Sequence, residues 1–471
     1  MCSECESVWY CGPEHQADDW TAGHRAECRP LFKIEYSKVL SRYMVAIREI
    51  KAGQAVLREN AMILGPKMNS VPVCLGCHAA LEPQAESEDY YRCRKCTWPL
   101  CSSKCEKSPR HSKECHLMAS KKYNSSIKYD GVVKPDASYC VVTPLRCLLL
   151  EKSKYDELLT LESHVKIRSA TDLYRVLKAN LVPFIKDFLG LPYDEETILK
   201  VAGVLDTNCF AVRSFSSATI RGLYMRAAML AHDCKPNTKH YFTEDMELVV
   251  LATVDIKKGT PITATYTQSL WGTEVRREHL LGAKCFQCSC QRCADPTELG
   301  TYLGALRCPK CKDGKVTSLK PLDTDSQWKC ECGFKLTAEQ VCRHHVDLQD
   351  QVKKLDKSKI ETMEEFLQQQ SKNPVVHDRI YEIVQVKHAL LQLYAKKITE
   401  LSPKQLQRYG NLLKELLDLA NILEPGLTRL RGELLYDLHA LRFLEVREKL
   451  TSGTIDKAKA QVFLKYYSSD M

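Results

Sequence analysis

The sequence predicts an α+β protein of several domains that is held together partly by zinc. The chain has 471 residues, more than one hydrophobic core usually supports, and 44% of them are hydrophobic. Strand patterns and turn signals fill its middle, whereas its C-terminal part has a helical pattern. Its 24 cysteines fall largely in close pairs. In a reducing compartment such pairs indicate metal ligands rather than disulfides.

The sequence also excludes several classes of protein. No run approaches the length of a membrane span, and no basic stretch precedes an apolar segment at the N-terminus, so we expect neither a span nor a signal peptide. We therefore expect a soluble, intracellular chain. The formal net charge is +9, but thiolates that bind zinc would cancel most of it. Nucleic acid and membranes are not expected as partners.

The densest group of metal-ligating residues lies between positions 74 and 115. Three close cysteine pairs and one His-x3-Cys pair are enough for two tetrahedral zinc sites. The pattern resembles the MYND zinc finger, whose two ions are held in a crossed arrangement. That resemblance implies one ion on Cys74, Cys77, Cys101 and Cys105, and the other on Cys93, Cys96, His111 and Cys115.

The first 28 residues resemble the later part of the same finger. One ion could bind to Cys2, Cys5, His24 and Cys28. Cys11 and His15 would then remain as half of a second site, because the opening cysteine pair of the motif would precede Met1. We interpret the incomplete motif in one of two ways: the natural protein begins upstream of Met1, or this chain is a shortened isoform.

Two more zinc sites are predicted further along the chain. Two cysteine pairs flank a short strand-rich insert, as in a zinc ribbon; they are Cys308, Cys311, Cys330 and Cys332. The run CFQCSCQRC supplies only Cys288, Cys290 and Cys293, whereas structural zinc takes four ligands. Cys234 is the best remaining candidate, although a free cysteine is often just a small buried side chain. In all, we expect about five zinc ions.

Periodicity predicts the secondary structure around these sites. Residues 44–50 and 247–256 are rich in β-branched side chains, and each run ends at a Lys-x-Gly turn signal, which predicts strands. Residues 346–450 contain few glycines or prolines and carry apolar side chains at three- and four-residue spacing, which predicts amphipathic helices. Breaks at 373–374, 402–403 and 424–426 indicate antiparallel helices of about twenty residues.

The order of these parts resembles one family. LAHDCKPN is similar to the NHSCxPN signature of SET-domain lysine methyltransferases, and CFQCSCQRC is similar to their post-SET zinc cluster. A MYND finger that interrupts the SET strands, followed by a helical domain, is the layout of the SMYD family, and the additional finger and ribbon suggest its divergent arthropod-type branch. The resemblance implies these divisions: 1–28 partial finger, 36–70 first SET segment, 74–115 MYND finger, 116–270 SET insert and core SET, 271–296 post-SET cluster, 305–335 zinc ribbon, and 340–471 helical TPR-like domain.

The resemblance also implies a methyl-transfer site. Tyr266, in ITATY, matches the catalytic tyrosine, and Phe210 matches an aromatic wall of the channel for the substrate lysine. The positions that would hold the cofactor S-adenosylmethionine are Arg42, Ala231, His232 and Phe286. For Tyr266, Phe286 and Phe210 the alternative is a packed core side chain, and for His232 a structural histidine.

Several positions depart from the family pattern. Tyr43 stands where the family has a glycine that lets the backbone approach the cofactor. Ala231 replaces an asparagine, Asp233 a serine and Lys284 a tyrosine. Each lost hydrogen bond to a ligand costs about 0.5–1.5 kcal/mol. The sequence therefore supports two functions: a protein-lysine methyltransferase, or a SET-derived adaptor with a weak or vestigial methyl-transfer site.

Both functions require protein partners. A methyltransferase would act on a lysine of a histone or another protein, and the MYND finger would bind proline-containing peptides or corepressors. We expect a monomer that contributes to transcriptional regulation in the nucleus and the cytoplasm.

Overall fold

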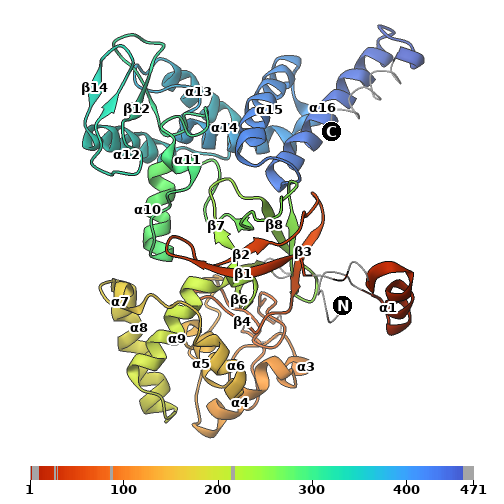
Figure 1. Cartoon of the computed structure of the whole chain (residues 1–471), viewed down its shortest axis with the longest axis vertical. Coiled ribbons are helices and arrows are strands. Elements are labelled where there is room, and N and C mark those ends of the chain that lie inside the picture. The colour runs from red at the N-terminus through yellow and green to blue at the C-terminus, as the bar shows by residue number, and fades with distance from the viewer. Residues whose placement is uncertain are drawn as a thin grey trace.

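The structure, a computed structural model, describes residues 2, 10–25, 28, 30–84, 89–213 and 218–459. Three parts follow one another along its longest axis (Figure 1). Short β-strands form the middle part. The segment 74–115 and a group of helices lie on one side of these strands, and a small sheet with the C-terminal helices lies on the other. The fold is thus mixed α and β, as the sequence predicts.

The strands of the middle part pair across long distances in sequence. β1 (Phe32–Ser37) and β2 (Ser41–Ala46) form an antiparallel hairpin. Two antiparallel sheets of three strands have the orders β3 (Ala55–Glu59), β9 (Leu248–Ala252), β8 (Thr238–Phe242), and β4 (Ile63–Gly65), β6 (Thr219–Leu223), β5 (Phe210–Arg213). β7 (Ala231–His232) pairs in parallel with β10 (Thr263–Ala264).

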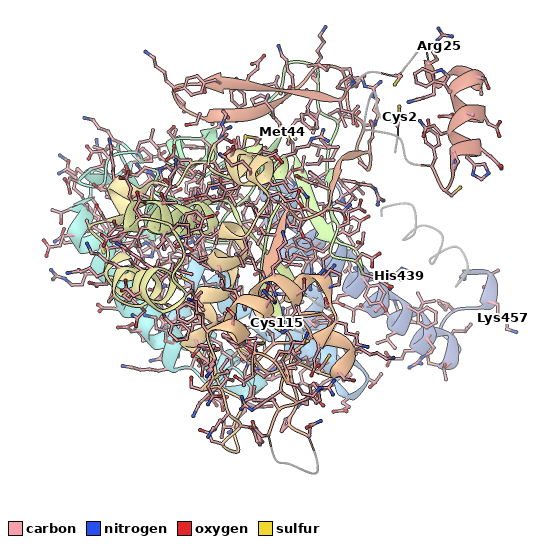
Figure 2. All side chains as sticks on the ribbon, turned by 90° about the horizontal axis from the view of Figure 1, so that it is seen from below. Cys2, Arg25, Met44, Cys115, His439 and Lys457 are labelled. Atoms are coloured by element: carbon pink, nitrogen blue, oxygen red, sulfur yellow. The ribbon has the colours of Figure 1, made fainter. Side chains whose placement is uncertain are left out.

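Both predicted strands are shorter than their β-branched runs. β2 ends at Ala46 and β9 ends at Ala252, before the ends of the two runs. The two runs still meet at their ends, because Ile50 and Ile256 form an isolated antiparallel bridge. Met44, in β2, is fully buried in the core between the sheets, and Figure 2 shows it inside the molecule.

Helices pack around the segment 74–115. Their bounds are α3 (Ser103–Glu106), α4 (Pro109–Ser120), α5 (Val142–Leu148), α6 (Lys152–Leu158), α7 (Val165–Arg168), α8 (Asp172–Pro183) and α9 (Glu195–Asn208). Side chains that favour helix starts cap the longer ones: Thr171 accepts from the backbone of α8 and Asp194 from that of α9. α4 has proline at its first position, where its missing N–H costs no hydrogen bond.

The chain then leaves the middle part along α10 (Thr273–Lys284) and the short α11 (Gln291–Ala294). A four-stranded antiparallel sheet follows in sequential order. Its strands are β11 (Leu306–Arg307), β12 (Lys315–Ser318), β13 (Trp328–Lys329) and β14 (Lys335–Leu336). At the other end of the chain, α1 (Pro13–Asp19) lies at the side of the molecule, and Figure 2 shows Cys2 and Arg25 there, away from Cys115.

The C-terminal part is helical, as predicted. Its helices are α12 (Ala338–Lys354), α13 (Ile360–Ser371), α14 (Tyr381–Lys396), α15 (Pro403–Leu423) and α16 (Arg429–Thr451). The predicted breaks fall between helices, and capping boxes start α12 at Thr337 and α15 at Ser402. Their apolar faces share one core with the small sheet.

Within the described ranges, no helix combines the length and the apolar character that crossing a membrane requires.

Candidate active site and metal centres

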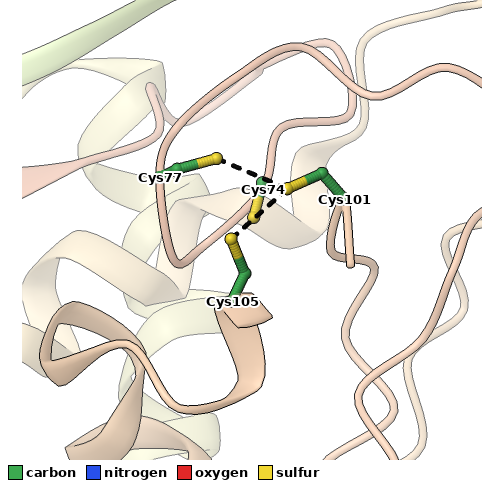
Figure 3. Close-up of side chains that lie close together, drawn as sticks. All are labelled: Cys74, Cys77, Cys101 and Cys105. Atoms are coloured by element: carbon green, nitrogen blue, oxygen red, sulfur yellow. Dashed lines mark hydrogen bonds between the residues drawn. The ribbon is translucent and has the colours of Figure 1, made fainter. Parts of the chain in front are cut away.

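The four thiols of the first cluster in the segment 74–115 converge on one point (Figure 3). The sulfur of Cys101 lies 3.5 Å from that of Cys77 and 3.3 Å from that of Cys105. A tetrahedral zinc ion with Zn–S bonds of about 2.3 Å would separate its ligand sulfurs by about 3.8 Å. The cluster, completed by Cys74, therefore has the spacing of a structural zinc site.

The second cluster interleaves with the first and is wholly buried. It consists of Cys93, Cys96, His111 and Cys115. The Cys93 and Cys115 sulfurs are 3.6 Å apart, and Nε2 of His111 lies 3.4 Å from the Cys96 sulfur. Along the chain, the pairs 74/77 and 101/105 belong to the first cluster, and the pairs 93/96 and 111/115 belong to the second. This alternation is the crossed arrangement that the MYND resemblance implies.

A buried carboxylate lies behind His111. Glu114 Oε1 lies 3.5 Å from His111 Nδ1, on the side of the ring opposite the thiols. Arg146 in turn donates to Glu114 through Nε at 3.0 Å and through Nη2. A carboxylate behind a ligand histidine fixes its tautomer and its orientation. The sequence analysis missed Glu114 and Arg146, although the three-residue spacing of His111 and Glu114 on a helix was a usable signal.

Cys234 completes the third cluster. Its sulfur lies 3.5 Å from that of Cys293 and 3.9 Å from that of Cys288, and Cys290 is the fourth member. Cys234 follows β7, whereas the other three follow α10. The cluster therefore joins the loop after β7 to a segment more than fifty residues later in the sequence.

Two fully buried arginines surround this cluster, and the sequence analysis missed them. Arg276 donates through Nε to the Cys234 sulfur at 3.3 Å and through Nη2 to the Cys293 sulfur at 3.6 Å. Its Nη1 lies 2.7 Å from Glu298, which also accepts from Arg292 at 3.1 Å. Four thiolates around one Zn²⁺ carry a net negative charge, so buried guanidinium donors stabilise the loaded site.

The ribbon cysteines form a fourth cluster between two hairpins. The sulfurs of Cys308 and Cys332 are 3.5 Å apart, and those of Cys311 and Cys330 are 3.7 Å apart. Gly314 makes room for them, because a Cβ there would lie 2.5 Å from the Cys330 sulfur and 2.8 Å from the Cys311 sulfur. The close C-x-C pair therefore fits a four-thiolate site.

The N-terminal segment holds a fifth group. Cys2, His24 and Cys28 lie together, and the Cys2 and Cys28 sulfurs are 3.4 Å apart. Cys5, the fourth predicted ligand, lies outside the described residues. Cys11 and His15, the predicted half site, are both exposed. The Cys11 sulfur lies 2.5 Å from Nδ1 of His15. The five groups together suggest five zinc sites.

Three of the residues implied by the SET resemblance come together beside the third cluster. The backbone N–H of Tyr266 donates to Nδ1 of His232 at 3.0 Å, and the two rings are 5.2 Å apart. The ring of Phe286 is 6.0 Å from that of His232. Because Nδ1 accepts, the neutral imidazole carries its proton on Nε2, which points at the Cys234 sulfur 3.3 Å away.

Burial keeps both titratable side chains neutral. Desolvation lowers the pKa of His232 to about 4, and it raises the pKa of Tyr266 to about 12. The Tyr266 hydroxyl donates to the backbone carbonyl of Leu230. Near pH 7 this site therefore offers a neutral phenol and a neutral imidazole.

Two other implied residues make contacts of their own. Arg42 is exposed on β2 and donates to the carbonyl of Thr160 at 2.6 Å. Phe210 packs edge-on against Tyr224 and His240, with ring centroids 5.9 and 5.2 Å apart.

Two departures from the family pattern find a structural explanation on β2 and β7. Tyr43 stands where the family pattern has a glycine. Its ring lies along the β1–β2 hairpin, and its hydroxyl donates to Glu35 at 3.3 Å. Ala231 is buried in β7, where it pairs with Thr263 of β10.

Lys284 enters the site from the end of α10. Its ammonium lies 5.6 Å from the centre of the Tyr266 ring and donates to the carbonyls of Thr207, at 2.6 Å, and Asp206, at 3.4 Å. Those carbonyls end α9, where a cation is favoured. Desolvation, helped by the nearby Arg168, lowers the pKa of Lys284. A cation thus stands beside the aromatic group.

The sequence of this chain is similar to those of known SET and MYND proteins. A sequence model of the MYND finger matches residues 1–28, and one of the SET domain matches residues 41–267. The chain is 32% identical over 346 residues to the SET domain-containing protein SmydA-8, isoform A, of Drosophila melanogaster, covering 70% of each protein. It is 26% identical over 264 residues to the human histone-lysine N-methyltransferase SMYD3, covering 53% of this chain and 58% of that protein.

Among solved structures, the SET domain of LSMT bound to lysine and AdoHcy aligns over 97% of this chain and 92% of that one, with 9% identity and a TM-score of 0.29. This score is too low to support a comparison of details.

The fold and the clusters of Cys and His define a SET-domain protein with a MYND finger, within the family of SET-domain protein-lysine methyltransferases. At this identity and coverage to SmydA-8, the chain belongs to the SMYD family, whose members combine SET and MYND domains.

Proposed function

We propose that this protein transfers a methyl group from S-adenosylmethionine to the side-chain amine of a lysine in another protein. The observation that carries the proposal is the convergence of His232, Tyr266 and Phe286 beside the cluster that Cys234 completes. These side chains come from β7, from the residues after β10 and from the residues after α10. Their meeting supports a role for the three residues together.

The chemistry of these residues fits the cofactor. Half-buried aromatic rings suit a flat adenine base and a sulfonium cation, which is attracted to the faces of aromatic rings. His232 is buried and Phe286 is half-buried, so both can shield a bound molecule from water. We propose that Phe286 and His232 hold the cofactor, together with backbone groups of Ala231. Arg42, whose side chain donates to the Thr160 carbonyl, and Phe210, which packs against His240, keep their predicted roles at the cofactor and in the lysine channel as further proposals.

S-adenosylmethionine, when bound, supplies a methyl group on a positively charged sulfur. The chain's own residues must align an amine with it and exclude water. The Tyr266 hydroxyl donates a hydrogen bond to the Leu230 carbonyl, so the lone pairs of its oxygen can accept one from the incoming amine. Since the tyrosine stays neutral, the lysine ammonium must lose its proton to water before it reacts.

Lys284 works against rapid turnover. Its ammonium lies 5.6 Å from the Tyr266 ring, where a second cation, either a sulfonium or a substrate ammonium, would be repelled. We therefore propose an enzyme that is slower than relatives with an aromatic residue at this position.

Calorimetric titration of the zinc-loaded protein with S-adenosylmethionine tests the proposal. We expect micromolar binding that Phe286→Ala abolishes and that Phe443→Ala, an exposed control on α16, leaves unchanged. Tyr266→Phe should keep binding and lose at least tenfold in methyl transfer to mixed protein substrates. No binding by folded, zinc-replete protein would rule the proposal out.

One observation favours an adaptor as the second candidate. A cleft of about 760 Å³ lies among α13, α14 and α15. Its walls carry side chains of both positive and negative charge. Lys387 pairs with Glu415, and Arg408 pairs with Glu364. Such a cleft could take a peptide of a partner protein. If no cofactor binds, this cleft and the MYND fingers become the functional surfaces, and proline-containing peptides or corepressors are the partners to test.

We further propose a monomer that acts on transcription in the nucleus and cytoplasm. The substrate could be a histone or another protein. Imaging of the tagged full chain, with sedimentation of the purified protein, would test location and oligomeric state.

A further inference from the structure

A second cleft is lined by residues of the first turns of α10, of the sheet β11–β14, of α12 and of the start of α14. Figure 1 shows these elements together on one side of the middle strands. Lys284, which lies beside the Tyr266 ring, is at the opposite end of α10. The volume of the cleft is about 120 Å³, whereas a single water needs only about 10–15 Å³. Six of its lining side chains matter here. They are Glu274, Glu278, Trp328, Cys342, Val346 and Tyr381.

Aromatic side chains form the inner wall of the cleft. Trp328 is 7% exposed and Tyr381 is 3% exposed. Tyr381 stacks on His345, with ring centroids 5.2 Å apart and planes 21° apart. His345 is fixed in turn, because its two nitrogens meet the Glu382 carboxylate at 2.8 Å and the Gly304 carbonyl at 3.1 Å. The aromatic wall is therefore rigid.

Two carboxylates stand at the mouth of the cleft without partners. Glu274 and Glu278 are exposed, lie one turn apart on α10, and make no hydrogen bond or ion pair with any described residue. The other acids of the lining are engaged: Glu298 pairs with two arginines, and Asp295 accepts from the backbone of Thr297 and Leu299. Among the residues that the structure describes, Glu274 and Glu278 are therefore the lining carboxylates without a hydrogen bond or ion pair; burial raises the pKa of Glu274, which also faces the charges of His345, Arg277 and Glu298.

Trp328 contributes a free donor. Its side chain is 7% exposed, and its indole N–H, which solvent still reaches, makes no hydrogen bond within the described part of the chain. A buried tryptophan usually finds an acceptor for this donor. A ligand for this cleft should therefore carry a hydrogen-bond acceptor as well as a positive charge.

A metal ion does not fit these groups. Ligands to one ion must approach one another closely, and the five clusters of that kind in the described residues do not include Glu274, Glu278 or Cys342. A primary ammonium fits poorly as well, because it is strongly hydrated and needs several close acceptors. A methylated ammonium keeps its charge, sheds water easily and is attracted to aromatic faces.

We infer that this cleft binds a methylated lysine side chain of a polypeptide. The aromatic wall takes the methylated head, the two glutamates attract its charge, and a backbone carbonyl of the polypeptide accepts from the Trp328 N–H. The inference does not depend on methyl transfer by this chain, because the cleft shares no residue with the group around Tyr266.

The test uses the full zinc-loaded chain and a defined probe, Nα-acetyl-trimethyl-lysine methylamide. Binding is followed by broadening of the N-methyl proton signal and by calorimetry. The comparison ligands are the unmethylated lysine amide and a neutral analogue with a tert-butyl head. We expect both to bind about tenfold more weakly than the probe, since cation–π attraction favours the charged, poorly hydrated head.

Variants locate the site. Glu274→Gln with Glu278→Gln should weaken binding of the probe about tenfold, and Trp328→Phe should weaken it with zinc content unchanged. Glu448→Gln, an exposed glutamate of α16, serves as the matched control and should have no effect. Equal affinity for the probe and either comparison ligand would overturn the inference. So would binding that survives the double substitution but disappears in Phe286→Ala, because the probe would then occupy the SET site.

Discussion

Arg276→Met should release zinc from the cluster of Cys234, Cys288, Cys290 and Cys293 far more readily than the native chain does. Arg276 is fully buried, and its guanidinium donates to two of the four thiols and to Glu298. The methionine side chain replaces the apolar stem of arginine, but it is shorter and lacks the charge and every donor. Glu298, itself 3% exposed, would keep only one of its two arginines.

The structure sets the magnitude of this effect. Removing one partner of a buried ion pair costs about 3–5 kcal/mol, and two charge-assisted hydrogen bonds to sulfur are lost with it. If this cost falls on the metal-bound state, affinity for zinc at this cluster drops by roughly two to four orders of magnitude. The other clusters should not change, because Arg276 contacts none of their ligands among the described residues.

A chromophoric chelator in competition with the protein measures the effect. Arg276→Met should lose one equivalent of zinc at chelator concentrations that leave the native protein fully loaded. Arg343→Met, which removes an exposed arginine paired with Glu339, is the control and should match the native protein. A release profile of Arg276→Met that overlays the native one would refute the assigned role of this arginine.

The remaining predictions concern metal content, Lys284 and pH. Elemental analysis of freshly purified protein should find about five zinc ions per chain, and two or fewer would contradict the cluster assignments. Lys284→Tyr removes the cation beside Tyr266 and should tighten S-adenosylmethionine binding about tenfold by calorimetry; unchanged or weaker binding would show that Lys284 acts only as a helix cap. Burial alone would lower the pKa of His345, but the charge and hydrogen bond of Glu382 outweigh burial and raise it. A raised folded-state pKa means that this pair stabilises the fold fully below the unfolded pKa of about 6.5 and loses its contribution as pH rises through the folded value. Denaturant unfolding should therefore show stability falling above neutral pH, and His345→Gln should flatten that dependence; equal slopes in both proteins would contradict it.

Close spacing in sequence explains which parts of the metal sites could be predicted. Pairs such as Cys74 and Cys77 lie on one turn, so their ligand atoms can hardly fail to meet. The arrangement of the pairs followed from family resemblance, and Cys234 was identified because three ligands needed a fourth. All of these predictions depend on residue type and number.

Buried polar partners could not be predicted in this way. Arg276 and Arg292 look like ordinary helix arginines in the sequence, and only folding places both against Glu298. The same holds for Arg146 and Glu114, which are thirty-two residues apart. The Tyr43 ring could have pointed to either face of its hairpin, and its cross-strand neighbour Glu35 decided the outcome. Strand ends were overestimated because β-branched residues continue into the turns after β2 and β9.

The short loop after β7 has a consequence for regulation. It holds His232 and Cys234 two positions apart, with the imidazole touching the sulfur. A ligand that settles against His232 and a metal held by Cys234 therefore share one piece of backbone, and their binding free energies must be coupled. Such coupling is reciprocal, so each should improve the other's affinity by the same factor. If the proposed cofactor binds against His232, loss of zinc from this cluster should therefore lower its affinity, without any dedicated regulatory domain.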